Sequence, residues 1–377
     1  QFLVDLALKT LLHDKLRFAI TVLGVAFAVM LVFVQAGLFI GLLDNATVTI
    51  EHASADLWVT AHNTPNVDFA HTFPEEYVQR VRAVPGVARA DNLLVQFMYI
   101  ALPNGAQESM LAYALEDFDR WNLPWDVSEG NIEDLRRGQF LFLDESSTRR
   151  FGKFAVGEYR EISGNRLKII GRTRGALSFS TTPIGFMNFH IAQDLQPDVL
   201  GNMTHYILVK LSPGADTAAV RAEIKRRLPY NDVYTKHEWS AQTTKYWLES
   251  TGLGLNMYLT VFLGCLIGVI VVALTLYTST MEHIKEFGTV KAIGGSNGDI
   301  YGILMRQALV AAVVGFALGV GPSYALRPAF ASIHLKLIIP PPLVLAVAAG
   351  TVVLCLGASM LSFGKVARID PALVFRG

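Results

Sequence analysis

Four long stretches without a charged residue place the strongest constraint on how this chain can fold. Asp, Glu, Lys and Arg are absent from residues 18–43, 250–281, 307–326 and 337–364. A helix needs roughly 20 apolar residues to cross the bilayer core, and each stretch is that long. Because backbone polar groups in lipid must pair within their own segment, each stretch should be helical. The sequence therefore predicts four transmembrane helices, at 18–43, 253–280, 300–326 and 337–364.

The charges on the short flanking segments give the chain an orientation. Lys and Arg are frequent in residues 1–17, 282–306 and 365–377, whereas the segment 327–336 holds only two of them. Cytoplasmic loops are enriched in Lys and Arg. We therefore expect a cytoplasmic helix at 1–17, a cytoplasmic tail at 365–377, and a large domain at 44–252 on the outer side of the membrane.

The outward domain has the composition of a soluble, mildly acidic region. Residues 44–252 carry 26 Asp and Glu against 21 Lys and Arg, with no basic stripe that would suit nucleic acid. The two cysteines, Cys265 and Cys355, lie in apolar runs, so this domain has no disulfide framework.

Metal-binding motifs give no positive signal. The sequence contains no C-x-x-C or H-E-x-x-H, and His52, His62 and His71 are not spaced as a helical ligand pair. We predict no metal site, although single haem ligands would leave no spacing signature.

The outward domain contains two similar runs of strand, helix and strand. Predicted strands lie at 56–60, 93–102, 204–211 and 232–235, and predicted helices lie at 74–83 and 216–228, the second with Ala219, Ile224 and Leu228 on its apolar side. Two βαβ units can pack as a ferredoxin-like α/β layer. We expect a porter-like α/β part at 44–105 and 204–235, a β-rich lobe at 106–203, and a helical stalk at 236–252 that continues into the second span. Within the lobe, residues 160–171 predict a hairpin turning at Gly164-Asn165.

Aromatic and small residues near the spans suggest membrane roles. Trp239, Tyr246 and Trp247 precede the second span, and such residues commonly anchor at the membrane interface. Three pairs of glycines four residues apart place small residues on one helix face: Gly37 and Gly41, Gly264 and Gly268, and Gly315 and Gly319. We expect these glycines to allow close helix packing, within the chain or between two protomers.

Residues 294–298 read G-G-S-N-G and match the G-x-S-x-G pattern of serine hydrolases. A nucleophile elbow needs a strand before the serine, but Ile284, Phe287, Val290 and Ile293 recur at helical spacing. Gly294 suits a helix C-terminus, and Ser296 followed by Asp299 is a capping-box pattern. The sequence therefore predicts an amphipathic cytoplasmic helix within 281–299, with Ser296 as a helix cap and not a nucleophile.

The same segment carries a family signature. Glu286-Phe287-Gly288-Thr289-Val290-Lys291-Ala292-Ile293-Gly294 keeps the pattern E-x-G-x-x-[KR]-A-x-G, and Glu282 precedes it. With one span, a large outward domain and three further spans, the chain resembles the MacB/FtsX/LolCE (type VII) ABC transporter permeases. The segments 235–238, 276–278 and 369–375, together with Tyr246-Trp247, resemble the DevC branch of exporter permeases.

This resemblance implies a coupling helix that docks on an ATPase. The residues that match the family's coupling motif are Glu282, Glu286, Phe287, Gly288, Lys291, Ala292 and Gly294. No G-x-x-x-x-G-K-[ST] motif is present, so ATP and Mg would bind a separate ATPase chain and this chain would have no catalytic residue or cofactor of its own. Two permease copies and two ATPase copies are the implied assembly.

The resemblance also implies a mechanism and a location. ATP-driven motion would pass through the membrane helices to the outward domain by mechanotransmission, and would drive export of a lipid or other hydrophobic compound. A periplasmic membrane-fusion adaptor and an outer-membrane channel are the implied partners, with the permease in a bacterial inner membrane.

Several alternatives remain open at this stage. An FtsX-like permease that activates a cell-wall enzyme and a haem-efflux permease share the four-span plan. A membrane-anchored sensor would need a cytoplasmic signalling domain, for which the cytoplasmic segments are too short. A hydrolase using Ser296 would lose its activity on substitution of that residue.

Overall fold

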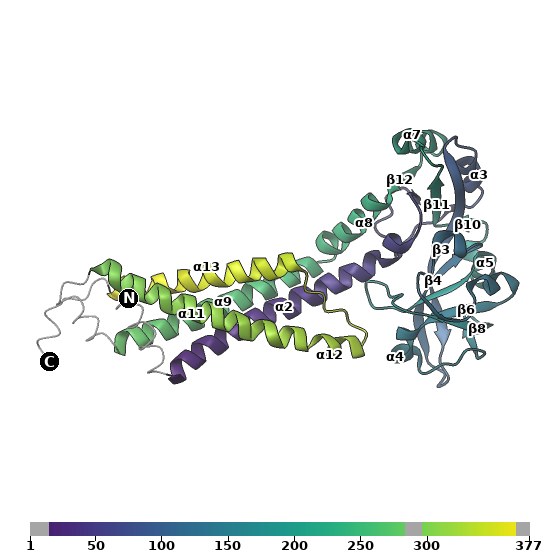
Figure 1. Ribbon diagram of the computed structural model, residues 1–377. Helices are drawn as coiled ribbons and strands as arrows, with labels where there is room; N and C mark the ends of the chain where they lie inside the picture. The colour runs from purple at the N-terminus through teal and green to yellow at the C-terminus, as the bar shows by residue number, and fades with distance from the viewer. Residues whose placement is uncertain (1–14, 283–295, 367–377) are drawn as a thin grey trace, which may run out of the picture. The chain divides into compact units, whose positions relative to one another are not determined.

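A computed structural model describes residues 15–282 and 296–366. These residues form two compact units (Figure 1). The α/β unit comprises Leu42–Gly254, and the helical unit comprises the residues on either side of it. Helix α2, Lys15–His52, contributes to both, because its C-terminal residues 42–52 belong to the α/β unit.

The helical unit contains the predicted spans. Its further elements are α9 (Leu253–Glu282), α11 (Asn297–Ala325), the short α12 (Arg327–Ser332) and α13 (Pro341–Val366). Within the described ranges, four helical segments are long and apolar enough to cross a membrane. The predicted fold class, four membrane helices with an α/β domain between the first and second, is confirmed.

Three of the differences between the observed and the expected helix boundaries have a clear physical reason. Helix α2 continues beyond residue 43 to His52, because residues 45–50 are largely buried within the α/β unit. Helix α11 begins at Asn297, three residues before the predicted start, because Ser296 caps it. Helix α13 begins at Pro341 and not at residue 337, since proline is tolerated in the first turn of a helix but lacks the N–H needed farther inside.

The α/β unit is built on a ferredoxin-like sheet, as predicted. Its four strands are β1 (Leu57–Ala61), β3 (Val87–Ala101), β11 (Tyr206–Leu211) and β12 (Asn231–Thr235), and its two helices are α3 (Tyr77–Arg82) and α7 (Thr217–Arg227). The strands pair antiparallel in the order β12-β1-β11-β3. This order is that of two βαβ units interleaved in one sheet.

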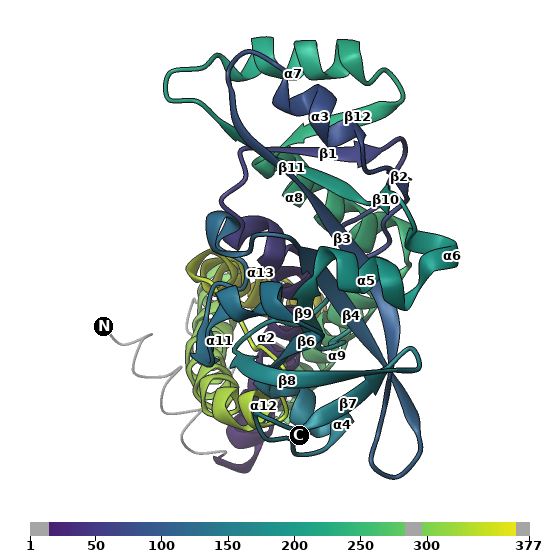
Figure 2. The ribbon, with the colours of Figure 1, turned by 90° about the vertical axis from the view of Figure 1, so that its right-hand side faces the viewer.

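Apolar residues on alternate strand positions give this sheet two buried faces. Leu57, Val59 and Val209 pack with Val220 and Ile224 of α7. The opposite face carries Trp58 and Tyr206, which pack with helix α8 (Lys236–Lys245). Figure 2 shows α3 and α7 on one side of β1 and β11, and α8 on the other. Position 219 of α7, expected on the apolar side, is exposed, and Val220 is buried in its place.

The β-rich lobe is inserted between β3 and β11. Its elements are β4 (Gln107–Leu115), β5 (Val127–Glu129), β6 (Phe140–Asp144), α4 (Thr148–Phe151), β7 (Tyr159–Ile162), β8 (Asn165–Thr173), β9 (Ile184–Asn188), α5 (Phe189–Leu195) and α6 (Pro197–Leu200), with a small β2 (Phe73–Pro74) and β10 (Met203–Thr204) pair beside it. Strand β3 continues into the lobe and pairs with β4, which is parallel to β9. The predicted hairpin is confirmed as β7–β8, but it turns at Ser163-Gly164, where both φ angles are positive.

The expected stalk is interrupted. Helix α8 is followed by a π-helical turn, Tyr246–Ser250, and then by a break at Gly252, whose φ of +72° ends the regular helix before α9. The expectation that Trp239 and Trp247 anchor at the membrane interface is wrong, because both side chains are buried inside the α/β unit.

Candidate functional site

The coupling segment is flanked by two described helix ends. Glu282 is the last residue of α9, and Ser296 is the N-cap of α11. The remaining residues assigned to ATPase coupling, Glu286, Phe287, Gly288, Lys291, Ala292 and Gly294, lie outside the described residues. The structure thus places the two ends of this segment in the helical unit, and the role of the motif remains a prediction.

Ser296 forms the capping box that the sequence predicts. Its Oγ accepts a hydrogen bond from the Asp299 backbone N–H at 3.2 Å and donates to Asp299 Oδ2 at 2.8 Å. The Ser296 backbone N–H donates to the same carboxylate oxygen at 2.8 Å. The side chains of Ser296 and Asp299 therefore satisfy each other's backbone N–H groups and start helix α11. Helix α11 follows directly, and the described element that precedes the segment is helix α9, so the strand of a nucleophile elbow is not found in the part of the chain described.

The paired glycines lie at close contacts within the helical unit. A Cβ at Gly264 or Gly268 of α9 would contact Leu31 or Ala28 of α2, and one at Gly315 or Gly319 of α11 would overlap Val25 or Val29 of α2. Gly37 and Gly41 differ from the expectation of helix against helix. They face the extended segment 336–339, whose Ile338 backbone N–H donates to the Gly37 carbonyl at 3.1 Å. A contact between protomers is neither shown nor required by these packings.

Substitution of Gly41 by valine is expected to destabilise the helical unit by about 1–3 kcal/mol, the usual cost of overpacking. A Cβ at Gly41 would overlap the backbone carbonyl of Lys336, which cannot rotate away as a side chain could. Gly357→Val in α13 is the matched control, because nothing lies within 4 Å of a Cβ there. The measurement is thermal unfolding of both variants in detergent. Equal losses at the two positions would contradict the close approach at Gly41.

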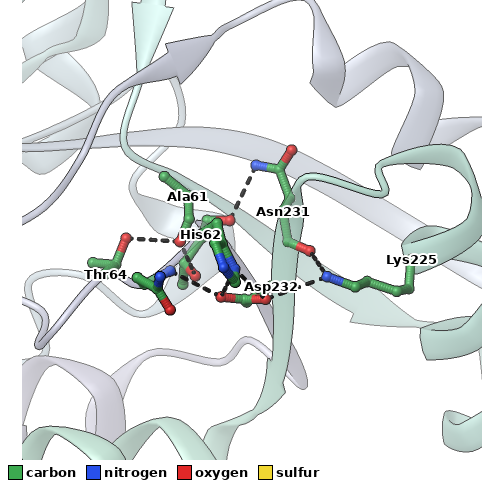
Figure 3. Close-up of polar contacts among 8 residues, drawn as sticks. Ala61, His62, Thr64, Lys225, Asn231 and Asp232 are labelled. Atoms are coloured by element: carbon green, nitrogen blue, oxygen red, sulfur yellow. Dashed lines mark hydrogen bonds and ion pairs between the residues drawn. The ribbon is translucent and has the colours of Figure 1, made fainter.

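The histidines singled out by the sequence have partners within the protein. The His62 Nδ1 lies 3.1 Å from Asp232 Oδ2, and Lys225 Nζ lies 3.3 Å from Asp232 Oδ1 (Figure 3). Burial raises the pKa of the Asp232 carboxyl, but hydrogen bonds from the Asn63 amide, His62 and Lys225 outweigh burial and leave that pKa below its usual value. These contacts fasten the loop after β1 to β12 and α7.

The other histidine environments also favour structural roles. His52 stacks on Trp125 with ring centroids 4.5 Å apart, and the buried His205 Nδ1 accepts a hydrogen bond from the Val95 backbone N–H at 3.1 Å. Burial, aided by the charge of His71, lowers the pKa of His205 to about 4, so this ring is neutral at neutral pH. Among residues 15–282 and 296–366, no group of three or more His, Cys, Asp or Glu side chains could hold a metal ion.

A second polar site, which the sequence did not reveal, lies where helices α2 and α8 pack within the α/β unit. We call it the stalk seam. Its residues are 45–50 of α2, Trp239 and Thr243 of α8, Trp247 of the π-helical turn, residues 66–69 of the loop after β1, Tyr113 of β4, and Phe179. The Phe179 ring stacks on Trp247 with centroids 3.8 Å apart and planes at 10°. Burial raises the pKa of Asp68 in this seam to about 7, opposed by a hydrogen bond from the Phe179 backbone amide. A single Asp in a loop gives no sequence signal of its burial.

Two family models match the chain. Residues 18–227 match the MacB-like periplasmic core domain, and residues 258–371 match the FtsX-like permease C-terminal region. The first match alone covers more than half of the chain. The protein belongs to the MacB/FtsX family of ABC transporter permeases. The second match includes the segment 283–295, which holds most of the residues that the sequence analysis predicts to form a coupling motif.

Several individual proteins are similar to this permease. An uncharacterized ABC transporter permease of Mycobacterium tuberculosis is 23% identical over 376 residues, which cover 98% of this permease and 99% of the relative. Another, of Mycobacterium bovis, is 31% identical over 112 residues, 30% of this permease and 31% of the relative. Among solved structures, the match to the periplasmic region of MacB from Actinobacillus actinomycetemcomitans covers 49% of this permease and 90% of the matched chain, at 9% identity and a TM-score of 0.39. The extracellular domain of YknZ from Gram-positive bacteria covers 48%, with 99% of its own length covered, at 15% identity and a TM-score of 0.37.

Proposed function

We propose that this permease couples ATP hydrolysis by a separate ATPase to export of a lipid or other hydrophobic compound. The observation that carries the proposal is the coupling motif between α9 and α11, within a chain of the MacB/FtsX family. Phe287 is the apolar anchor on the ATPase, Lys291 sets the register by its charge, and Gly288 allows close approach. Two permease copies and two ATPase copies form the proposed complex.

The proposed mechanism is mechanotransmission. Helix α2 belongs to both units, so displacement at its membrane end acts on the α/β unit through one hydrogen-bonded backbone. The π-helical turn and the break at Gly252 place an irregular backbone ahead of α9, where a change of direction is least costly. In this mechanism, α2 is a continuous helix, whereas the path from α9 to α8 is interrupted by the π-helical turn and the break at Gly252.

An apolar groove supports a hydrophobic substrate. It lies within the helical unit between α2, α9 and α13 and has a volume of about 350 Å³. Its lining contains no Asp, Glu, Lys or Arg, and the Thr351 hydroxyl donates to the Val347 carbonyl at 2.7 Å, so it offers an acyl chain an apolar wall. The match of residues 18–227 to a MacB-like core domain favours an exporter over a permease that only activates a cell-wall enzyme. A DevC-like system with an adaptor and an outer-membrane channel is the more specific form of this proposal.

The test is the ATPase activity of the purified permease, alone and with its candidate ATPase subunit. We expect no activity from the permease alone and permease-dependent activity from the pair. The double variant Phe287→Ala/Lys291→Glu should abolish this dependence, because it removes the anchor and reverses the charge that sets the register.

Ser296→Ala serves as the control for this experiment. It removes only a helix cap, worth about 1 kcal/mol, and should leave the permease-dependent activity intact. If the pair assembles normally and the double variant behaves as wild type, the proposed docking residues are wrong. If Ser296→Ala alone abolishes a measured hydrolytic activity of the permease, the hydrolase alternative gains support.

A further inference from the structure

A polar pocket lies in the α/β unit, beside the junction of the ferredoxin-like sheet and the lobe. Its volume is about 460 Å³, within the range of about 300–1,000 Å³ that is typical of small-molecule sites. Its walls are the C-terminal end of α3, residues 87–91 of β3 and the segment 116–120 that follows β4. Strand β3 continues from this pocket into the lobe (Figure 2). We call it the arginine pocket, and its charged lining residues are Arg82, Arg89, Asp91, Glu116, Asp117 and Arg120.

The carboxylate of Asp91 is already bonded on both oxygens. Its Oδ1 accepts a hydrogen bond from Arg82 Nη2 at 2.7 Å, and its Oδ2 accepts one from Trp121 Nε1 at 2.8 Å. The Nε of Arg82 also donates to the Ala90 carbonyl at 2.7 Å. These bonds hold the end of α3 and the ring of Trp121 on β3, and neither oxygen of Asp91 is without a donor.

The other two acids of the pocket also have basic partners. Asp117 Oδ2 lies 2.6 Å from Arg120 Nε, and Asp117 Oδ1 forms an ion pair with Arg136. Glu116 Oε1, at the margin of the pocket, lies 3.1 Å from His190 Nε2. One carboxylate is thus shared by two guanidinium groups, and the pocket with its immediate neighbours holds four arginines against three acids.

Arg89 is the arginine of the pocket that pairs with no acid among the described residues. Its Nη2 donates to the Arg120 carbonyl at 3.1 Å, and its guanidinium carbon lies 5.3 Å from the ring centroid of Trp121. An arginine has five N–H donors, so these contacts position the group and leave most of its donors unused. The Nη atoms of Arg120 also have no partner within residues 15–282 and 296–366. The pocket therefore offers unused donors from two arginines on different elements.

Unused guanidinium donors beside acids that already have partners favour a ligand that accepts hydrogen bonds and carries negative charge. Guanidinium groups bind carboxylate and phosphate through paired N–H···O bonds. One guanidinium can satisfy the two oxygens of a carboxylate, whereas a terminal phosphate group presents three acceptor oxygens. A phosphate can therefore use two arginines at once. Arg89 on β3 and Arg120 on the segment 116–120 supply that pair.

We propose that the arginine pocket binds a phosphate group between Arg89 and Arg120, carried either by a free phosphate ion or by a lipid headgroup. The site goes beyond the proposed function, because neither the coupling motif nor the apolar groove contributes to it. In its lipid form the inference rests on the proposed function, and it names the polar end of the exported compound as the part that the α/β unit recognises.

A phosphate at this position would join two parts of the α/β unit. Arg89 belongs to β3, which starts in the ferredoxin-like sheet, whereas Arg120 belongs to the segment between β4 and β5. The same segment contacts the end of α2, because the Asn122 side chain donates to the His52 carbonyl at 2.9 Å. Binding should therefore stabilise the contact between the sheet and the segment that holds the C-terminal end of α2.

The test is calorimetric titration of the full permease in detergent with inorganic phosphate and with glycerol 3-phosphate, at constant ionic strength. We expect saturable binding of at least one of them at one site per chain, and no binding of glycerol. Tighter binding of glycerol 3-phosphate than of inorganic phosphate assigns the pocket to a lipid headgroup. Binding that is no tighter assigns it to the free ion.

Variants of Arg89 test whether the pocket is the binding site. Arg89→Gln should weaken binding about tenfold or more, because it removes a charged donor group. Arg89→Lys keeps the charge but loses the paired N–H groups, so it should also weaken binding. Arg166→Gln is the matched control. Arg166 also lies over an aromatic ring, 4.9 Å from the centroid of Tyr159, and pairs with no acid among the described residues, but it lies outside the pocket.

The Arg166→Gln permease should bind phosphate as wild type does. Equal losses for Arg89→Gln and Arg166→Gln would indicate a general effect of charge and overturn the site. Absence of saturable binding by the wild-type permease would overturn it without any variant. The unfolding midpoint of each variant without phosphate distinguishes loss of the site from loss of the fold. Because the ATPase is absent from these titrations, their failure refutes this inference alone, whereas failure of the Phe287/Lys291 experiment refutes the coupling proposal alone.

Discussion

Replacement of Trp239 by alanine is expected to destabilise the α/β unit by about 3–5 kcal/mol, the usual cost of deleting a fully buried tryptophan. The side chain is completely buried between α8 and the ferredoxin-like sheet. Its ring stacks on Tyr234 with centroids 5.2 Å apart and packs at 5.9 Å from Tyr206. Helix α8 is held on the sheet mainly by this residue. Truncation to alanine would therefore leave a cavity between α8 and the sheet that the neighbouring side chains cannot fill.

The measurement is the unfolding transition of the α/β unit in the full permease, followed by calorimetry in detergent. Trp239→Phe should lose much less than alanine, since it keeps an aromatic ring and removes an indole N–H that has no partner among the described residues. Tyr230→Ala is the control, because that side chain is 86% exposed and its truncation should cost within about 0.5 kcal/mol. A Trp239→Ala transition as high as that of Tyr230→Ala would mean that α8 is not packed on the sheet as described.

The features that the sequence predicted well are those set by local chemistry. The four spans follow from the cost of charge and of unpaired backbone in lipid, so uncharged runs locate the last three helices to within a few residues, whereas the first helix runs on to His52. The ferredoxin-like sheet follows from strand alternation, which places Leu57 and Val59 on one face and Trp58 on the other. The capping box at Ser296 follows from side-chain chemistry that acts over three residues.

The features that the sequence missed depend on contacts between distant segments. Trp247 reads as an interface anchor because it precedes a span, yet its ring is buried by Phe179, 68 positions earlier in the chain. Gly37 and Gly41 form a helix-packing pattern, but they contact the extended segment 336–339. The periodicity of the sequence does not predict this contact. Local pattern cannot distinguish a glycine that faces a helix from one that faces a strand-like segment, since both require only close approach.

Substitution of Asp68 by asparagine is expected to stabilise the permease at high pH. The change that it makes in the free energy of unfolding should be more favourable at high pH than at low pH by up to about 4 kcal/mol. The unfolded chain releases this proton near the ordinary value of 3.8, whereas burial raises the pKa of Asp68 in the folded state to about 7. The folded state therefore binds more protons than the unfolded state between pH 4 and pH 7. Its stability must fall as the pH rises through that window and then level off.

Asparagine keeps the shape and most of the hydrogen bonding of the protonated acid, but it cannot ionise. We therefore expect similar denaturation midpoints for wild type and Asp68→Asn near pH 4, and a higher midpoint for the variant near pH 8. Chemical denaturation of the full permease at several pH values measures this difference. A variant less stable than wild type at pH 8 would mean that the carboxylate is ionised and well bonded in the seam.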